Sequence, residues 1–254
     1  MERVSFNRLS SLLVTFGLKH SSKILADIIE RAERDEQTHR EFLLAVLETE
    51  AKGRNERRRH RNYAGAHFPP VVKSLEEFDP SELESGITES QLHHLKELGW
   101  LDSYGNVVLA GPPGLGKTMI AVGLGLHAVN EGYTVCFEKM ANLIRILDES
   151  GVERSATFRL KNIRKAQLVI IDEIGYTPIN REQANRFFTL ISETYEKNSI
   201  IFTTNKEITE WAEMIGDPVL TTAMLDRILH HAKCFSLRGK SYRLKHPEMY
   251  PGKP

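Results

Sequence analysis

The stretch NVVLAGPPGLGKT at residues 106–118 determines the fold class of the chain. Its first five residues predict a strand. The remainder fits the pattern G-x-x-x-x-G-K-[ST] where this motif requires it, between a strand and an apolar helix. Backbone N–H groups of such a loop surround phosphate oxygens, and the helix N-terminus adds a favourable dipole. Nucleotide contacts are therefore expected from Gly111, Pro112, Pro113, Gly114, Leu115, Gly116, Lys117 and Thr118.

The last two residues of this loop suit particular parts of a nucleoside triphosphate. The ammonium of Lys117 can reach the β- and γ-phosphates, and the hydroxyl of Thr118 can bind magnesium. A glycine-rich turn with a chance lysine is the alternative, and it leaves the flanking strand and helix unexplained.

Short apolar runs alternate with helical patterns around the loop and beyond it. Strands are expected at 106–110, 134–137, 168–171, 200–203 and 233–237. Helices are expected at 117–130, 139–149, 155–165, 181–196 and 217–231. This alternation predicts an α/β fold with a mainly parallel sheet covered by helices on both faces.

Polar residues follow two of these strands, at the edge where ligands bind in open α/β sheets. Asp172 is expected in the magnesium shell with Thr118 and close to the nucleotide. The adjacent Glu173 can polarise a water for attack on the γ-phosphate. Asn205, after the fourth strand, is expected to orient that water together with Glu173, unless it belongs to an ordinary asparagine turn.

Arg227 lies on the last of the expected helices and is a further candidate. An arginine finger that reaches the γ-phosphate of a neighbouring copy raises the rate by about 10³–10⁵. The alternative is a surface salt bridge with Asp226 or another acid. The residues alone favour neither interpretation.

The composition bounds the class of protein. The chain has 254 residues, 34 basic and 34 acidic side chains and 41% apolar residues, which is enough for a packed core. No apolar run is long enough to span a membrane, and the N-terminus lacks the apolar stretch of a signal peptide, so the cytoplasm is expected. Cys136 and Cys234 lie far apart without C-x-x-C spacing, which argues against a disulfide framework or a zinc site.

The N-terminal part shows a different pattern. Apolar residues at spacings of three and four predict amphipathic helices, the last of which continues into an arginine-rich run. The sequence HFPP at 67–70 then ends the helix. We expect a small all-helical domain over 1–67, a linker over 68–85 that is extended to about residue 80, and a nucleotide-binding domain over 86–254.

The net charge of zero conceals basic clusters that suit a polyanion. Residues 52–61 carry six basic side chains and one acidic side chain. Residues 139–165 carry seven basic and three acidic side chains, and residues 227–245 carry six basic and no acidic side chains. DNA phosphate contacts are expected from Arg54, Arg57, Arg58, Arg59 and Arg61 in the first cluster and from Lys139, Arg145, Arg154, Arg159, Lys161 and Arg164 in the second. For each residue the alternative is an ordinary solvated helix face.

Together these motifs resemble the AAA+ ATPases of the IstB and DnaC group, and within it the IstB-like transposition helper ATPases. The resemblance covers most of residues 68–246. Its markers are LEEFD at 75–79, GPPGLGKT at 111–118, VIIDEIGY at 169–176, IIFTTN at 200–205, LDRILHHA at 225–232 and RGKSYRLK at 238–245.

The resemblance implies roles at the matching positions. Lys117 and Thr118 contact nucleotide and magnesium, Asp172 and Glu173 form the second acidic motif, and Asn205 is the first sensor. Arg227 becomes an arginine finger acting in trans, which implies a homo-oligomer formed with ATP. Only 27 residues follow Arg227, too few for the helical lid of many AAA+ proteins, so a lidless core is expected; a nucleotide contact by Arg243 is not favoured.

Three functions are compatible with these residues. The first is an ATP-dependent clamp on duplex DNA that assists a transposase in insertion-sequence transposition. The second is a helicase loader of the DnaC or DnaI kind that binds single-stranded DNA. The third, a P-loop kinase for a small metabolite, explains neither the basic clusters nor the acidic pair as well. The expected ligands are ATP and Mg²⁺, without a membrane partner.

Overall fold

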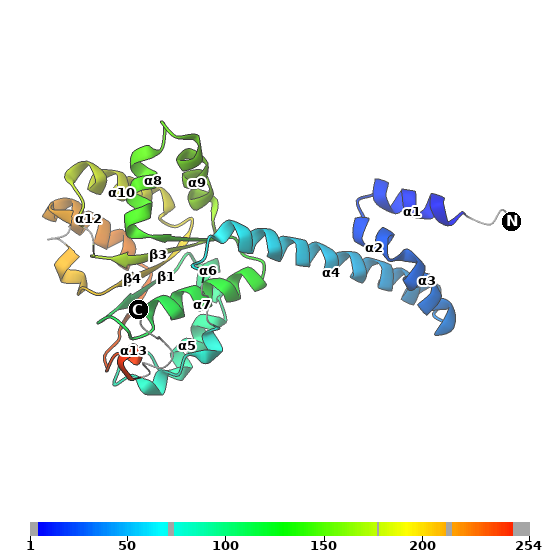
Figure 1. The fold of residues 1–254 in the computed structure, drawn as a ribbon, viewed down its shortest axis with the longest axis horizontal. Helices are drawn as coiled ribbons and strands as arrows, with labels where there is room; N and C mark the ends of the chain where they lie inside the picture. The colour runs from blue at the N-terminus through cyan, green and yellow to red at the C-terminus, as the bar shows by residue number, and fades with distance from the viewer. Residues whose placement is uncertain (1–4, 71–73, 177, 212–214, 246–254) are drawn as a thin grey trace, which may run out of the picture. The chain divides into compact units, whose positions relative to one another are not determined.

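The computed structural model describes residues 5–70, 74–176, 178–211 and 215–245 (Figure 1). The chain divides into two compact units between Arg61 and Asn62, a few residues before the expected domain end at residue 67. The division falls within helix α4 (His39–Ala66), since the helix continues through the arginine-rich run. As expected, it ends directly before His67 and the two prolines, which cannot continue a helix.

The N-terminal unit is helical, as the spacing of its apolar residues predicts. It contains α1 (Phe6–Thr15), α2 (Lys19–Lys23), α3 (Leu25–Arg34) and the first part of α4. Leu25 and Val46 are buried between these helices. The buried carboxylate of Glu50 accepts hydrogen bonds from the backbone N–H groups of His20 and Ser21, at 2.6 and 3.1 Å, and so fixes the start of α2 against α4.

The C-terminal unit is built on a five-stranded sheet. Its strands are β1 (Asn106–Ala110), β2 (Val135–Lys139), β3 (Leu168–Ile174), β4 (Ser199–Thr204) and β5 (Ala232–Ser236). Their order is β2-β3-β4-β1-β5, and every pairing is parallel, as predicted. The expected third strand ended at residue 171, whereas β3 continues to Ile174 through a register shift against β4.

Helices cover both faces of this sheet (Figure 1). They are α5 (Glu89–Lys96), α6 (Gly99–Asp102), α7 (Lys117–Asn130), α8 (Met140–Glu149), α9 (Arg154–Lys165), α10 (Arg181–Thr194), α12 (Pro218–Leu229) and α13 (Tyr242–Lys245). One core joins Val108 to apolar residues of α8, α9, α10 and α12. The other joins Val107 and Leu109 to α5, α6 and α7, because neighbouring strand residues point to opposite faces.

The segment expected as an extended linker is not extended throughout. It contains two 3₁₀ turns, η1 (Leu75–Glu77) and η2 (Pro80–Glu82), which begin at the capping residues Ser74 and Asp79. Leu75 is buried, and its Cβ would lie 2.9 Å from a Cβ placed on Gly123 of α7. The segment belongs to the C-terminal unit, and it packs there because Gly123 leaves room on α7 for the Leu75 side chain.

The described chain ends shortly after the last strand. After α12 the described residues form only β5 and the short α13, up to residue 245. Among the described residues, no helix combines the length and the hydrophobicity that crossing a bilayer requires.

Candidate nucleotide-binding site

The loop between β1 and α7 depends on glycine at two tightly packed positions. Gly114 and Gly116 both have a φ of 84°, a conformation that other residues adopt only with strain. A Cβ on Gly114 would lie 2.1 Å from the Ser241 hydroxyl oxygen, and one on Gly116 would lie 2.6 Å from the Phe78 ring. The loop leads directly into the N-terminus of α7, which is the arrangement that binds phosphate.

The Lys117 side chain lies against the same loop. Its ammonium donates hydrogen bonds to the carbonyl oxygens of Gly111 and Pro112, at 2.6 and 2.7 Å. A phosphate in the loop would compete with these carbonyls for the ammonium protons. Lys117 is therefore already held at the position from which it can contact a phosphate.

Asp172 on β3 and Thr118 at the start of α7 are joined by a hydrogen bond. The Thr118 hydroxyl donates to the Asp172 carboxylate at 2.8 Å, and the Thr203 hydroxyl donates to the same oxygen. Burial raises the pKa of the Asp172 carboxyl above its ordinary value, although these two hydrogen bonds lower it in part. A cation bound here would favour the ionised carboxylate, and clustered hydroxyl and carboxylate oxygens are the ligands that Mg²⁺ prefers.

Glu173 is directed by an irregularity in β3. It has a left-handed φ of 63°, and the register shift against β4 falls between Ile171 and Ile174, on either side of the acidic pair. Its backbone N–H donates to the Thr203 hydroxyl at 3.0 Å, and its carboxylate forms an ion pair with Lys139 at 2.9 Å. Such irregularities re-aim a side chain beside an active site, so the two adjacent acids have different surroundings: Asp172 is buried and Glu173 half-exposed.

Asn205 follows the end of β4 and carries a polar atom without a protein partner. Its Oδ1 atom is buried and accepts no hydrogen bond from the described residues. A buried, unpaired acceptor is costly, so it indicates a ligand or a water. Asn205 lines the same cavity as Glu173, which is the arrangement expected for two residues that orient one water.

These residues enclose a cavity of about 560 Å³, which is large enough for a nucleotide. Of the residues expected to bind nucleotide, positions 113–118 line it together with Glu173 and Asn205. Gly111 and Pro112 contribute through the carbonyls that hold Lys117, and Asp172 through its bond to Thr118.

The cavity has further lining residues that the sequence analysis did not single out. Phe78 from the linker and Tyr176 after β3 contribute aromatic rings, and Lys240 and Tyr242 contribute polar groups. The last two belong to a segment, residues 237–242, that we call the C-terminal strap. The strap begins at β1, where the Leu237 N–H donates a hydrogen bond to the last carbonyl of that strand at 2.8 Å. It ends at the phosphate loop, where the Tyr242 N–H donates to a loop carbonyl at 2.9 Å. The basic run at 227–245 contained the signal, but it could not show which of its residues lines the cavity. The Arg243 side chain lies outside the described residues.

Arg227 is not part of this cavity. It lies near the end of α12, which leads into β5 beside Asn106, the first residue of β1. The nucleotide loop follows the other end of β1, so Arg227 and the loop lie toward opposite edges of the sheet. Its guanidinium donates to the Ala223 carbonyl at 2.7 Å and lies 4.9 Å from the centre of the Phe188 ring. Within one chain, the structure does not bring Arg227 to the nucleotide site.

One expected DNA contact is wrong. Arg159 of α9 is only 8% exposed and forms a buried ion pair with Glu138. Its guanidinium also donates to the carbonyl oxygens of Phe137, Gly65 and Ala66. Such a fully engaged guanidinium has a structural role, and the phosphate of a bound DNA cannot reach it.

The other basic residues of this region lie at the surface. Exposed side chains on α8 and α9 are Arg145, Arg154, Lys161 and Arg164, of which Arg145 pairs with Glu149 and Arg164 with Glu193. Lys139 is half-exposed and is engaged by Glu173. A DNA contact from Lys139 would therefore compete with the ion pair at the candidate water-activating acid.

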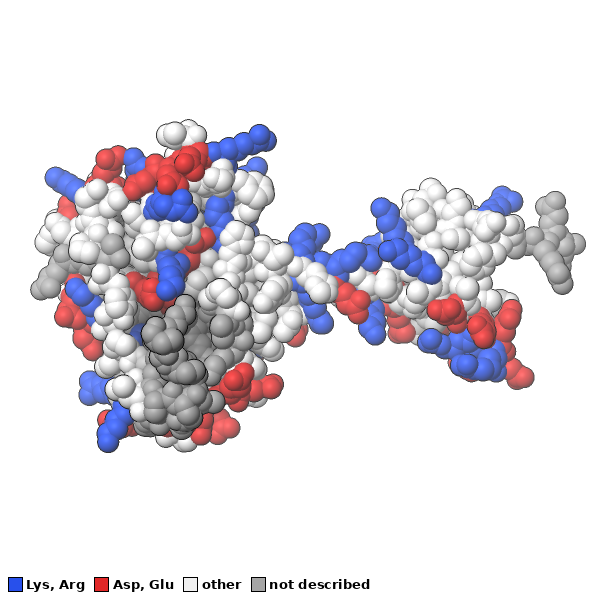
Figure 2. Space-filling model, in the orientation of Figure 1, with Lys and Arg blue, Asp and Glu red and all other residues white. Residues whose placement is uncertain are grey.

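The arginines of α4 form a dense basic surface within a single helix. Lys and Arg side chains cluster along this helix in Figure 2. Arg54, Arg57, Arg58, Arg59 and Arg61 are all exposed. Arg54 and Arg57 each pair with Glu50 at 3.1 Å, which directs their guanidinium groups along the helix.

The parallel sheet, the glycine-rich phosphate loop and the acidic pair at the end of β3 define a P-loop nucleotide-binding domain of the AAA+ class. Solved structures share this fold. A structure of DnaI matches with a TM-score of 0.54 and 17% identity over 65% of this chain and 90% of that one. A structure of DnaA bound to AMPPCP and single-stranded DNA matches with a TM-score of 0.54 and 15% identity, over 72% of this chain and 55% of that one.

The sequence comparisons identify the family. The chain belongs to the IstB-like ATP binding proteins, whose family pattern matches residues 11–249. It is 41% identical to the insertion sequence IS21 putative ATP-binding protein of Pseudomonas aeruginosa, over 94% of this chain and 89% of that protein. It is 36% identical to the corresponding IS232 protein of Bacillus thuringiensis, over 95% of this chain and 96% of that protein. The resemblance drawn from the motifs is thereby confirmed.

Proposed function

We propose that the chain is a cytoplasmic ATPase that assembles on duplex DNA in its ATP-bound form and assists the transposase of an insertion sequence. The observation that carries the ATPase part is the arrangement of Thr118, Glu173 and Asn205 around one cavity, with Asp172 bonded to Thr118. The transposition part is supported by the insertion-sequence proteins to which the chain is similar along most of its length.

In this proposal, the residues of the cavity divide the work of hydrolysis. Lys117 exchanges its bonds to the loop carbonyls for bonds to the β- and γ-phosphates. Glu173 accepts a proton from a water whose oxygen attacks the γ-phosphorus, and the bond between that phosphorus and the bridging oxygen breaks to release ADP. Asn205 orients the water through its buried Oδ1 atom. A magnesium ion held near Thr118 and Asp172 would neutralise charge on the phosphates.

Arg227 acts on the nucleotide of a second copy in this proposal. Its place near the end of α12, outside the residues that line the cavity of its own chain, supports action in trans. A site completed by a neighbour would couple ATP binding to the assembly of a homo-oligomer.

The exposed basic residues of α4, α8 and α9 are the proposed DNA contacts. They are suited to the phosphate backbone rather than to base edges, so binding should depend on salt and only weakly on sequence. The N-terminal unit also exposes large apolar side chains, among them Phe16 at 75% and Leu43 at 57%. Exposed apolar groups of this kind are suited to contact with a protein partner such as a transposase.

The alternative partner is a replicative helicase loaded on single-stranded DNA, and a gel-shift titration separates the two. The variant Glu173→Gln, with ATP present to hold the bound state, is titrated with long duplex and with single-stranded DNA at two salt concentrations. The proposal predicts duplex binding that requires ATP, increases with duplex length and weakens with salt. A preference for the single strand would favour the helicase loader instead.

A further inference from the structure

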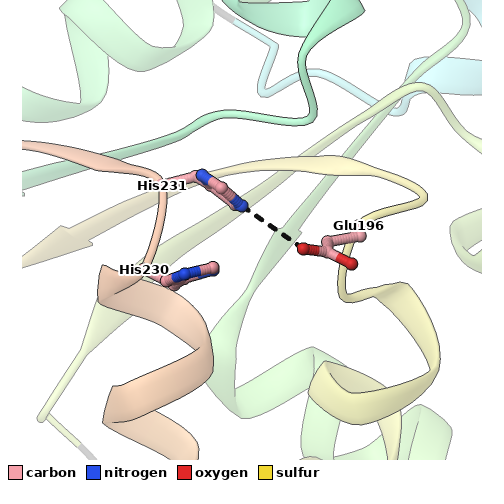
Figure 3. Close-up of side chains that lie close together, drawn as sticks. All are labelled: Glu196, His230 and His231. Carbon is pink, nitrogen blue, oxygen red and sulfur yellow. Dashed lines mark hydrogen bonds and ion pairs between the residues drawn. The ribbon is translucent and has the colours of Figure 1, made fainter.

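Three side chains with metal-binding groups lie together outside the nucleotide site. Glu196 is in the turn after α10, and His230 and His231 follow the end of α12 (Figure 3). One potential ligand atom from each residue lies within 4.8 Å of the other two, and the Nε2 atom of His231 is 3.4 Å from a carboxylate oxygen of Glu196. In the part of the chain that the structure describes, this is the one such group of three.

The residue types and the spacing suit a transition metal. Two histidines and one glutamate are an established ligand set for zinc, with metal–ligand distances near 2.0–2.2 Å. Tetrahedral ligands at such distances are about 3.4 Å apart, which matches the separation between His231 and Glu196. Imidazole nitrogens distinguish this group from the oxygen-rich surroundings of Asp172, because Mg²⁺ prefers oxygen ligands and Zn²⁺ accepts nitrogen.

The turn that carries Glu196 is fixed before any ion binds. Glu196 has a left-handed φ of 53°, which is unusual outside glycine. The next two residues, Lys197 and Asn198, donate backbone hydrogen bonds to the Thr194 carbonyl. The buried amide of Asn198 donates to two carbonyls at the end of α9, that of Arg164 in its last turn and that of Ala166 directly after it. The carboxylate is therefore presented by a turn with little freedom.

The segment that carries the histidines is tied to the same part of the sheet. The Asn106 side chain joins the two sides, because it donates to the Ile228 carbonyl and accepts from the Ile200 N–H, each at 2.9 Å. The Asn106 backbone N–H donates to the His231 carbonyl at 3.0 Å. The His230 ring contacts the Tyr195 hydroxyl at 2.7 Å through its Nδ1 atom, which is the kind of support that fixes the ring of a metal ligand.

We propose that Glu196, His230 and His231 bind a divalent transition-metal ion of the Zn²⁺ type, with the fourth position taken by water. The site is separate from the magnesium site, because it lies beside the first residue of β1 whereas the phosphate loop follows the last. Its ligands are two histidines and a glutamate, so the cysteine spacing does not bear on it. A bound ion would tie the end of α12 to the turn after α10, one helical turn from Arg227.

Isothermal titration of the full, untagged chain with Zn²⁺ tests the proposal, after treatment with a chelator and without nucleotide or magnesium. The parent protein is expected to bind one Zn²⁺ per chain. The variants Glu196→Gln and His231→Asn are each expected to bind at least about tenfold more weakly, since each loses one of three ligands. The matched control is His94→Asn, because His93, His94 and Glu97 on α5 are exposed and of the same residue types, but are not a group whose three ligand atoms lie within 4.8 Å of one another.

Thermal unfolding shows that the variants are folded. All three ligand residues are exposed, so the metal-free variants should unfold at the same temperature as the parent. Added Zn²⁺ should raise the unfolding temperature of the parent and of His94→Asn, but not that of Glu196→Gln. Absence of stoichiometric binding to the parent would overturn the proposal, as would equal affinity of Glu196→Gln and the parent, or a loss in His94→Asn as large as in His231→Asn.

Discussion

The hydroxyl of Thr118, in the first turn of α7, donates a hydrogen bond of 2.8 Å to the carboxylate of Asp172 near the end of β3. The two residues are 54 positions apart in the chain. Their contact places the end of the phosphate loop beside the acidic pair, and it leaves Glu173 and Asn205 at the wall of the same cavity.

Replacement of Lys117 by alanine should abolish ATP binding. The ammonium is held at the loop by two carbonyl oxygens, at the position from which it can contact two phosphates. Titration with a fluorescent ATP analogue measures the affinity, with Lys165→Ala on the surface of α9 as a control. An ATP affinity equal to that of the parent would exclude the proposed role of the phosphate loop.

Replacement of Arg227 by alanine should reduce ATP turnover by about 10³-fold or more if the guanidinium acts as a finger. Each variant chain can still receive an arginine from a neighbour that retains it. A mixture of Arg227→Ala with Lys117→Ala protein should therefore regain part of the turnover, because a Lys117→Ala chain supplies Arg227 to a competent site. Two inactive proteins that stay inactive when mixed would leave Arg227 without a role in trans.

Arg159 should matter for stability rather than for DNA binding. The change Arg159→Ala leaves the buried Glu138 carboxylate without its ion-pair partner and removes a donor from three carbonyls, which should lower the free energy of unfolding by about 3 kcal/mol. Arg164→Ala removes a half-exposed ion pair from the same helix and should change the free energy of unfolding by less than about 0.5 kcal/mol. Urea denaturation measures the free energy of unfolding of both variants. Equal stability of the two would contradict the structural role of Arg159.

Neutralisation of Arg57, Arg58 and Arg59 to glutamine should weaken duplex binding and reduce its dependence on salt. Each lost phosphate contact lowers the slope of log K against log salt by about 0.9. The control removes the same charge from other exposed positions of the N-terminal unit, with Arg31, Arg34 and Arg40 changed to glutamine. If both triple variants show the slope of the parent, the α4 arginines are an ordinary solvated face.

The sequence was sufficient where a residue type is dictated by local physics. The glycines of the loop, the apolar strands and the acidic pair at residues 172–173 could all be placed, because backbone conformation and burial restrict them strongly. Arg159 of α9 could not be distinguished from its exposed neighbours, since its burial depends on Glu138, which lies on β2. Lys240 was missed for a similar reason: the fold of the C-terminal strap, not the local pattern, brings it to the cavity.

The central claim is that the cavity beside Thr118 and Asp172 hydrolyses ATP with Glu173 as the base. ATP affinity and ATP turnover should be measured side by side for the parent, for Glu173→Gln and for Glu193→Gln, the control for an exposed acid on α10. We expect all three to bind ATP with similar affinity, and turnover to fall by about 10²-fold or more in Glu173→Gln alone. Turnover by Glu173→Gln at the rate of the parent would contradict the account.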